Sequence, residues 1–300
     1  MSREEAVDTC CASCGVAEID DIKLMPCDDC DLVRYCSDEC QRDCEKRVAE
    51  LRDELLFKQP EGSHMGDCPI CSLPLPLDKS KTAMYECCSK VICMGCIYAN
   101  YERETELRRA PSCPFCRGTF STPEEAKEEA NKLRMKRVEA NDPVAMCQEG
   151  FKRFEKGEYQ SAFELYTKSA ELGYVEAHYR LARLYHERKG VEKDEGKLTH
   201  HLEEAAIGGH PDARYVLGCV EWVNNNNTER AVKHWIIAAT QGEDESIKEL
   251  MKAFKQGSVS KEELASALRA HKAAVDETKS QQREAANGFE KYRNEVQGLS

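Results

Sequence analysis

The chain has few aromatic residues and no long apolar stretch. Aromatic residues make up 7% of its 300 residues and charged residues 33%, so one large apolar core is not expected; two or three small domains fit the length. No segment approaches the roughly 18 continuous apolar residues that a membrane span requires. The first residues, Met1 to Asp8, lack the apolar core of a signal peptide. We therefore expect an intracellular protein, cytoplasmic or nuclear, without a membrane partner.

Positive charge is also scarce. The 43 Lys and Arg residues are outnumbered by 55 Asp and Glu residues, which gives a formal net charge of −12. Phosphate backbones are normally bound by clustered Lys and Arg side chains. Nucleic acid is therefore disfavoured as a partner, and proteins are the expected partners.

Cysteines, in contrast, are abundant and concentrated. All 18 except Cys147 and Cys219 lie before residue 117, mostly as repeated Cys-x-x-Cys pairs. Such pairs in a chain without a signal peptide indicate zinc thiolates rather than disulfides. Cys147 and Cys219 fall within predicted helices, where they are expected to act as small core hydrophobes.

The first cysteine group, residues 10–45, is spaced as Cys11-x-x-Cys14, Cys27-x-x-Cys30, Cys36-x-x-x-Cys40 and Cys44. Two cysteines three apart can place both sulfurs on one tetrahedral ion. With the stretch from Tyr35 to Gln41, this order resembles a MYND zinc finger. The resemblance implies interleaved ligands: Cys11, Cys14, Cys36 and Cys40 for one zinc, and Cys27, Cys30 and Cys44 for a second.

This MYND-like finger is truncated. The family normally has a histidine between the sixth and last cysteines, but here only Gln41 to Asp43 intervene and the next histidine is His64. The second site is one ligand short, and either Cys10 or a water could complete it. Alternatively, the finger folds around a single ion.

Residues 46–65 are interpreted as a connecting helix and linker. Val48, Leu51, Leu55 and Leu56 have helical spacing, which predicts a helix over residues 45–58 packed on a zinc module.

The second cysteine group lies in residues 66–120. It consists of Cys68-Pro-Ile-Cys71, Cys87-Cys88, Cys93-Met-Gly-Cys96 and Cys113-Pro-Phe-Cys116, enough thiols for two tetrahedral sites. The opening and closing pairs resemble those of a RING-type zinc finger. That resemblance implies a cross-brace, with one ion held by Cys68, Cys71, Cys93 and Cys96 and the other by Cys87, Cys88, Cys113 and Cys116.

The centre of this module departs from ordinary RING fingers. Lys90 stands where they have histidine, and an ammonium group has no lone pair for a metal. Eight-cysteine RING fingers place a cysteine five residues before the third pair, as Cys88 is placed here. Cys87 has the weakest geometric support, since adjacent side chains diverge in extended backbone.

The RING resemblance implies a surface for a ubiquitin-conjugating enzyme. Ile70, Pro114 and Arg117 match contact positions of that family, while Tyr98 or Tyr101 could replace its usual aromatic contact. A RING finger has no catalytic residues of its own; it orients a thioester. The three or four Zn²⁺ ions expected in the whole chain would be structural.

The second half of the chain is predicted to be helical. Thr122 and Pro123 begin a solvated linker helix within residues 121–142, with Leu133, Met135 and Val138 as its few apolar anchors. From there, residues recur at spacings of 36 and 33, for example Tyr166, Leu202 and Trp235. Such a period is typical of a helical solenoid.

The phrases Ala177 to Tyr185 and Ala205 to Gly209 resemble Sel1-like repeats, which would occupy residues 143–275 and present a protein-binding face. The histidines in this region are expected at surface or packing positions; they are His178, His200, His201, His210 and His234. Residues 276–300 read as a polar tail, either a fraying helix or disordered. The expected fold is small zinc-stabilised α+β modules followed by an all-α helical-repeat solenoid.

Two functions follow from these expectations. The first is a RING-type ubiquitin ligase that recruits a substrate through its repeats. The second is a non-enzymatic, zinc-dependent scaffold for protein interactions. A metalloenzyme would need an open zinc position, for which only the incomplete site near Cys44 is a candidate.

Overall fold

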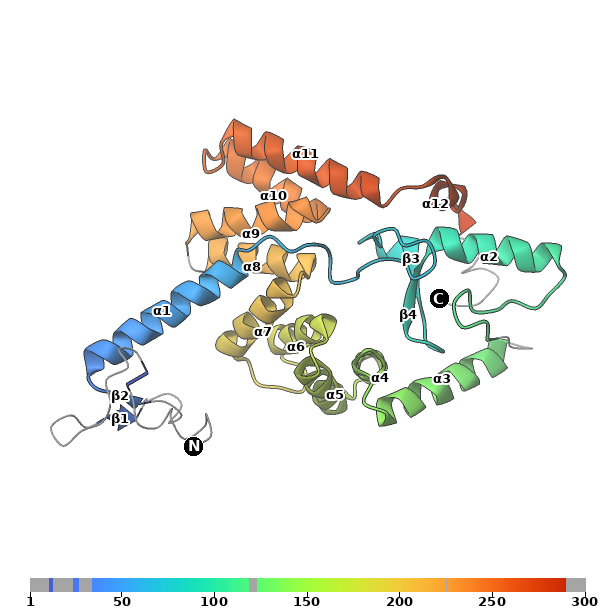
Figure 1. The fold of residues 1–300 in the computed structure, drawn as a ribbon, viewed down its shortest axis with the longest axis horizontal. Helices are drawn as coiled ribbons and strands as arrows, with labels where there is room; N and C mark the ends of the chain where they lie inside the picture. The colour runs from blue at the N-terminus through green and yellow to red at the C-terminus, as the bar shows by residue number, and fades with distance from the viewer. Residues whose placement is uncertain (1–10, 13–23, 27–33, 119–122, 225, 290–300) are drawn as a thin grey trace. The chain divides into compact units, whose positions relative to one another are not determined.

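The described part of residues 1–58 contains short strands and one long helix. The computed structural model describes residues 11–12, 24–26, 34–118, 123–224 and 226–289 (Figure 1). The chain divides into two units, residues 1–58 and 59–300, which are described separately. In the first, β1 (Met25–Pro26) pairs antiparallel with β2 (Arg34–Tyr35), and α1 (Asp38–Leu56) follows.

Helix α1 begins inside the first cysteine group. The Ser37 hydroxyl accepts a hydrogen bond from the Cys40 N–H (3.2 Å) and so caps the helix. The predicted helix therefore exists but starts seven residues earlier than expected, at Asp38 rather than residue 45. The expected packing was wrong for Val48, Leu51 and Leu55, whose side chains are exposed; only Leu56 is buried.

The second unit opens with the second cysteine group. A 3-10 turn, η1 (Lys79–Lys81), leads into β3 (Thr82–Tyr85), which pairs antiparallel with β4 (Lys90–Cys93) before α2 (Met94–Glu106). The core of this module contains both cysteine and apolar side chains, among them Cys68, Leu75, Ile92, Cys93, Met94, Cys96 and Ile97. This core is small, which is why metal would contribute to its stability.

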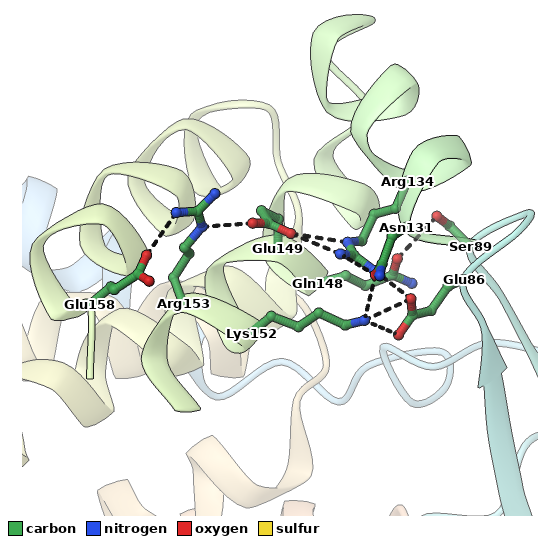
Figure 2. A network of polar contacts seen from close by, with 9 residues as sticks. All are labelled: Glu86, Ser89, Asn131, Arg134, Gln148, Glu149, Lys152, Arg153 and Glu158. Carbon is green, nitrogen blue, oxygen red and sulfur yellow. Dashed lines mark hydrogen bonds and ion pairs between the residues drawn. The ribbon is translucent and has the colours of Figure 1, made fainter. Parts of the chain in front are cut away.

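Helix α3 (Pro123–Glu139) is more than a solvated linker. Arg134 on α3 is almost fully buried, and its guanidinium donates to Glu149 Oε2 (Nε, 3.1 Å) and to Glu86 (Figure 2). Lys152 also binds Glu86, at 2.8 Å. An ion-pair network therefore joins α3 to the β-hairpin of the cysteine module and to the first repeat helix. The expected cap, Thr122, lies outside the described residues.

Helices α4 to α11 form the repeat array (Figure 1). They pack in sequential pairs: α4 (Pro143–Glu155) with α5 (Tyr159–Glu171), α6 (Val175–Glu187) with α7 (Glu195–Ile207), α8 (Pro211–Val223) with α9 (Thr228–Thr240), and α10 (Asp244–Lys255) with α11 (Lys261–Glu277). Each pair also contacts the next, so the array is a stack in which neighbours bury each other's apolar faces. The expected fold class is confirmed.

Equivalent repeat positions have equivalent burial. Tyr166, Leu202 and Trp235 are all at most 2% exposed. The glycine that ends the second helix of a pair has positive φ in each of three repeats, for example +82° at Gly173. Only glycine adopts this conformation without cost. Cys147 lies in an apolar core between the repeat helices, and Cys219 packs against another such core, as expected.

Residues 281–289 return to the cysteine module. Helix α12 (Gln281–Ala285) packs on α2, and Ala286 and Phe289 belong to the core of that module (Figure 1). The expectation of a fraying or disordered tail is therefore wrong for residues 281–289. Among the described helices, none combines the length and apolar character needed to cross a bilayer.

Candidate metal centres

The structure brings together the first four cysteines of the predicted cross-brace. Cys68 and Cys71 lie on a tight turn in which the Ser72 N–H donates to the Cys68 carbonyl (2.9 Å). Cys93 ends β4 and Cys96 lies in the first turn of α2, so both face that turn. The four sulfurs lie within 4.8 Å of one another, with 3.9 Å between the Cys68 and Cys96 sulfurs.

The other four cysteines gather in the same way. The sulfurs of Cys87, Cys88, Cys113 and Cys116 lie within 4.8 Å of one another. Cys87 and Cys88 occupy the turn of the β-hairpin, where Ser89 has a φ of +52°. The backbone there is not extended, so the argument that adjacent side chains diverge does not apply. Both sulfurs can face the last pair, Cys88 to Cys113 at 3.8 Å and Cys87 to Cys116 at 3.5 Å.

These separations fit zinc. Zinc–sulfur bonds are about 2.3 Å long, and the edge of a tetrahedron is about 1.63 times its centre-to-corner distance, which gives about 3.8 Å between sulfurs. Four of the sulfur–sulfur distances in the two sets lie between 3.5 and 3.9 Å. No disulfide joins any two of the cysteines that the structure describes.

The thiols of each set share protons through hydrogen bonds to one another. Hydrogen bonding from Cys96 lowers the pKa of Cys93 to about 4, and hydrogen bonds from Cys87 and Cys88 lower the pKa of Cys113 to about 2. The pKa values of Cys96 and Cys87 are raised, because each donates its proton to a neighbouring thiolate. Like charges at this distance oppose further ionisation. A divalent metal would allow all four thiols of a set to ionise.

Part of the first cysteine group also converges. The sulfurs of Cys11, Cys36 and Cys40 lie within 4.8 Å of one another, with Cys36 and Cys40 3.4 Å apart. Cys14, Cys27 and Cys30, the other predicted ligands here, lie outside the described residues. Cys44 is one turn further along α1 and packs against the small core around Tyr35.

A group that the sequence did not predict joins His64, Glu176 and His210. The Nε2 atoms of His64 and His210 lie 3.4 and 3.1 Å from Glu176 Oε2. Burial alone would raise the pKa of Glu176, but hydrogen bonds from His210 and His64 hold it well below its usual value. From the sequence, His64 was placed in the linker of residues 46–65 and His210 was expected only at a surface or packing position.

The geometry of this group favours hydrogen bonding over metal binding. The Ala213 N–H donates to His210 Nδ1 (3.4 Å), which places the ring proton on Nε2 as a donor to Glu176. The rings of His64 and His210 are stacked at 4.0 Å and 7°. Lone pairs of parallel rings do not converge on an ion about 2.0 Å from each nitrogen. We interpret the group as a clasp that holds residues 59–65 on α6 and α8.

The predicted conjugating-enzyme contacts have different environments. Ile70 is 43% exposed, Pro114 is buried, and Arg117 is exposed with its Nη1 donating to Asn100 Oδ1 (2.6 Å). Phe115, which was not identified from the sequence, is 43% exposed beside Pro114. Its position inside the last cysteine pair was the available signal.

The two tyrosines considered as aromatic contacts are engaged elsewhere. Tyr98 and Tyr101 pack against Phe289, with ring centroids 5.1 and 5.0 Å apart.

Between the β-hairpin and helices α4, α6 and α8 lies a cavity of about 660 Å³, lined on its two sides by residues such as Met84 and Phe151.

Comparison with known protein families supports the first cysteine group and the helical repeats. The MYND finger family matches residues 11–46, and the Sel1 repeat family matches residues 145–174, 175–210 and 217–243. The predictions of a MYND finger and of Sel1 repeats are thereby confirmed. Neither family covers the second cysteine module or α10 and α11. The chain therefore contains a zinc-binding MYND finger and Sel1 repeats, both of which are protein-interaction modules.

Solved structures show distant similarity. A Sel1 repeat protein from Oxalobacter formigenes is 18% identical over 68% of this chain and 78% of its own, with a TM-score of 0.43. The protective antigen c5321 of uropathogenic Escherichia coli, which displays an SLR fold, is 19% identical over 68% of this chain and 48% of its own, with a TM-score of 0.40. No curated protein matches the chain.

Proposed function

We propose that this chain is a zinc-dependent, RING-type ubiquitin ligase that docks a conjugating enzyme on its second cysteine module and recruits a protein through its repeats. The observation that carries the proposal is the interleaving of the two four-cysteine sets. This interleaving fixes two loops that carry exposed apolar side chains, Ile70 in the first cysteine pair and Phe115 in the last. Zinc, when bound, supplies structural cross-links between these loops.

The docking surface would combine these loops with helix α2. Asn100 on α2 donates to the Ser112 carbonyl (3.2 Å) and accepts from Arg117 (2.6 Å), which ties the helix to the last cysteine loop. Ile70 and Phe115 would supply apolar contacts for the conjugating enzyme. Arg117 would hold the enzyme–ubiquitin conjugate in a reactive pose, so the rate gain would come from orientation rather than covalent chemistry.

The cavity beside the repeats is the candidate site for a substrate segment. Met84 and Phe151 are exposed apolar side chains on its walls, while Lys152 and Arg180 contribute charge. A cavity of about 660 Å³ can accommodate a few residues of a peptide, whereas a flat protein surface would not enter it.

Ubiquitin transfer tests the proposal directly. The full chain, a panel of conjugating enzymes and labelled ubiquitin would be assayed for self-modification. Ile70→Ala and Phe115→Ala should each reduce transfer about tenfold or more, because truncating a hot-spot contact costs about 2 kcal/mol or more and about 1.4 kcal/mol corresponds to tenfold. Met251→Ala, an equally exposed apolar residue in the repeats, is the control and should leave transfer unchanged. Absence of both transfer and binding across the panel would refute the proposal.

A non-enzymatic scaffold is the second candidate. Two observations favour it: Pro114 is buried, and the Arg117 guanidinium already binds Asn100 within the chain. The scaffold would bind conjugating enzymes or other proteins without accelerating transfer. Binding without transfer in the same panel would therefore select it.

A further inference from the structure

Two residues of α12 lie against the metal-ligand set formed by Cys68, Cys71, Cys93 and Cys96. Arg283 Nη2 is 3.4 Å from Cys71 Sγ, and Gln282 Nε2 is 3.7 Å from Cys96 Sγ. Backbone oxygens position both side chains. Arg283 donates to the Pro74 (2.7 Å) and Leu73 (3.1 Å) carbonyls, and Gln282 donates to the Gly95 carbonyl (3.2 Å). The two donors therefore reach the sulfurs from a fixed position about 200 residues away in sequence.

An apolar contact holds this segment in place. Ala286 and Phe289 are buried in the core of the cysteine module, and the Phe289 ring packs on Tyr98 and Tyr101. The close approach of α12 to α2 also leaves no room for a side chain at position 95. A Cβ added at Gly95 would lie 2.8 Å from Arg283 Cα and 2.9 Å from its Cγ, closer than real contacts. Gly95 is thus the residue that lets α12 approach the thiols.

The chemistry of a four-thiolate site explains why such donors matter. Four thiolates around one Zn²⁺ carry a net charge of about −2. A guanidinium that donates to one sulfur offsets part of this charge and makes that thiolate a weaker base and nucleophile. Loss of such an outer partner typically reduces metal affinity about 10–100-fold.

We propose that residues 281–289 form the outer sphere of the metal centre that contains Cys68 and Cys71, with Arg283 and Gln282 as its positioning residues. The segment controls how tightly Cys68, Cys71, Cys93 and Cys96 retain zinc and how readily their sulfurs react with electrophiles. The proposal rests only on the metal-binding part of the proposed function, and it holds equally for a ligase and for a scaffold.

The test measures zinc transfer from the full chain to a chromophoric chelator. Arg283→Gln should raise the release rate of one zinc ion about tenfold while the remaining ions leave at the wild-type rate. Arg283→Lys keeps the charge and should restore part of the retention. Arg269→Gln, an exposed arginine on α11, is the matched control and should behave as wild type.

A second variant displaces the segment without removing charge. Gly95→Ala should also release one ion faster, although alanine favours a helix over glycine by about 1 kcal/mol. Alkylation by N-ethylmaleimide, located by mass spectrometry, should become faster at Cys71 and stay constant at Cys116 in both variants. Release and alkylation at wild-type rates in both variants would overturn the proposal. Wild-type protein that holds no zinc would overturn the proposed function as well.

Discussion

Replacing Arg134 tests the ion-pair network that joins α3 to its neighbours. The side chains of Arg134 and Glu149 are only 5% and 7% exposed, so Arg134→Ala leaves a buried carboxylate with one fewer cation. Breaking a buried pair typically costs 3–5 kcal/mol. Because Arg153 still binds Glu149 and Lys152 still binds Glu86, we expect the lower end, about 3 kcal/mol.

The matched control uses the same carboxylate. Arg153 also binds Glu149 (2.7 Å), but its side chain is 37% exposed. Arg153→Ala should therefore cost no more than about 1 kcal/mol. At about 2–4 °C per kcal/mol for a unit of this size, the melting temperature should fall about 6–12 °C for Arg134→Ala and at most about 4 °C for Arg153→Ala.

Calorimetry of the full chain with saturating zinc measures both shifts. A double-mutant cycle with Glu149→Gln isolates the pair, since the cost of Arg134→Ala should shrink once the partner is uncharged. Equal shifts for Arg134→Ala and Arg153→Ala would refute the argument that burial makes this pair important. An unchanged cost in the Glu149→Gln background would refute the assigned partner.

Three further predictions concern the repeats and the histidine clasp. Burial lowers the pKa of His234 to about 3; the unfolded chain, with a pKa of about 6.5, therefore takes up this proton first. The stability that this group contributes is complete above about pH 6.5 and falls by about 1.4 kcal/mol per pH unit below it. In urea unfolding between pH 7 and 5, the free energy of unfolding should depend less steeply on pH in His234→Gln than in the wild type, and identical slopes would contradict this. Gly218→Ala places a Cβ 2.3 Å from Trp235 Nε1 and should destabilise the fold by about 1–3 kcal/mol, whereas Gly196→Ala, whose nearest contact is 3.4 Å away, should not; similar urea midpoints would count against the packing. His64→Ala should lower the melting temperature but leave the zinc content unchanged, and loss of one zinc ion would show that the clasp binds metal.

The cysteine modules and the repeats were predictable because their signals are local or periodic. Spacings such as Cys68-x-x-Cys71 report turn geometry directly, and the recurrence of Tyr166, Leu202 and Trp235 reports helix packing. Polar contacts between distant segments leave no such pattern. In the sequence, Arg134 is one charge among many in a predicted solvated helix, and Arg283 is one polar residue in a predicted tail.

Backbone conformation explains the other differences. The weak geometric support given to Cys87 assumed extended backbone, but the sequence did not indicate that Cys87 and Cys88 lie in a hairpin turn. Helix α1 was predicted from its apolar spacing alone, so its cap at Ser37 was missed. The same apolar residues, Val48, Leu51 and Leu55, were expected to pack but are exposed, because periodicity indicates a helix face without identifying what covers it.

The central claim is that the cysteine groups are metal centres, and the zinc content of the intact protein tests it most directly. Native mass spectrometry of the reduced full chain should find three or four zinc ions, two from the interleaved cysteine sets and the rest from the MYND finger. Two or fewer ions would contradict the account.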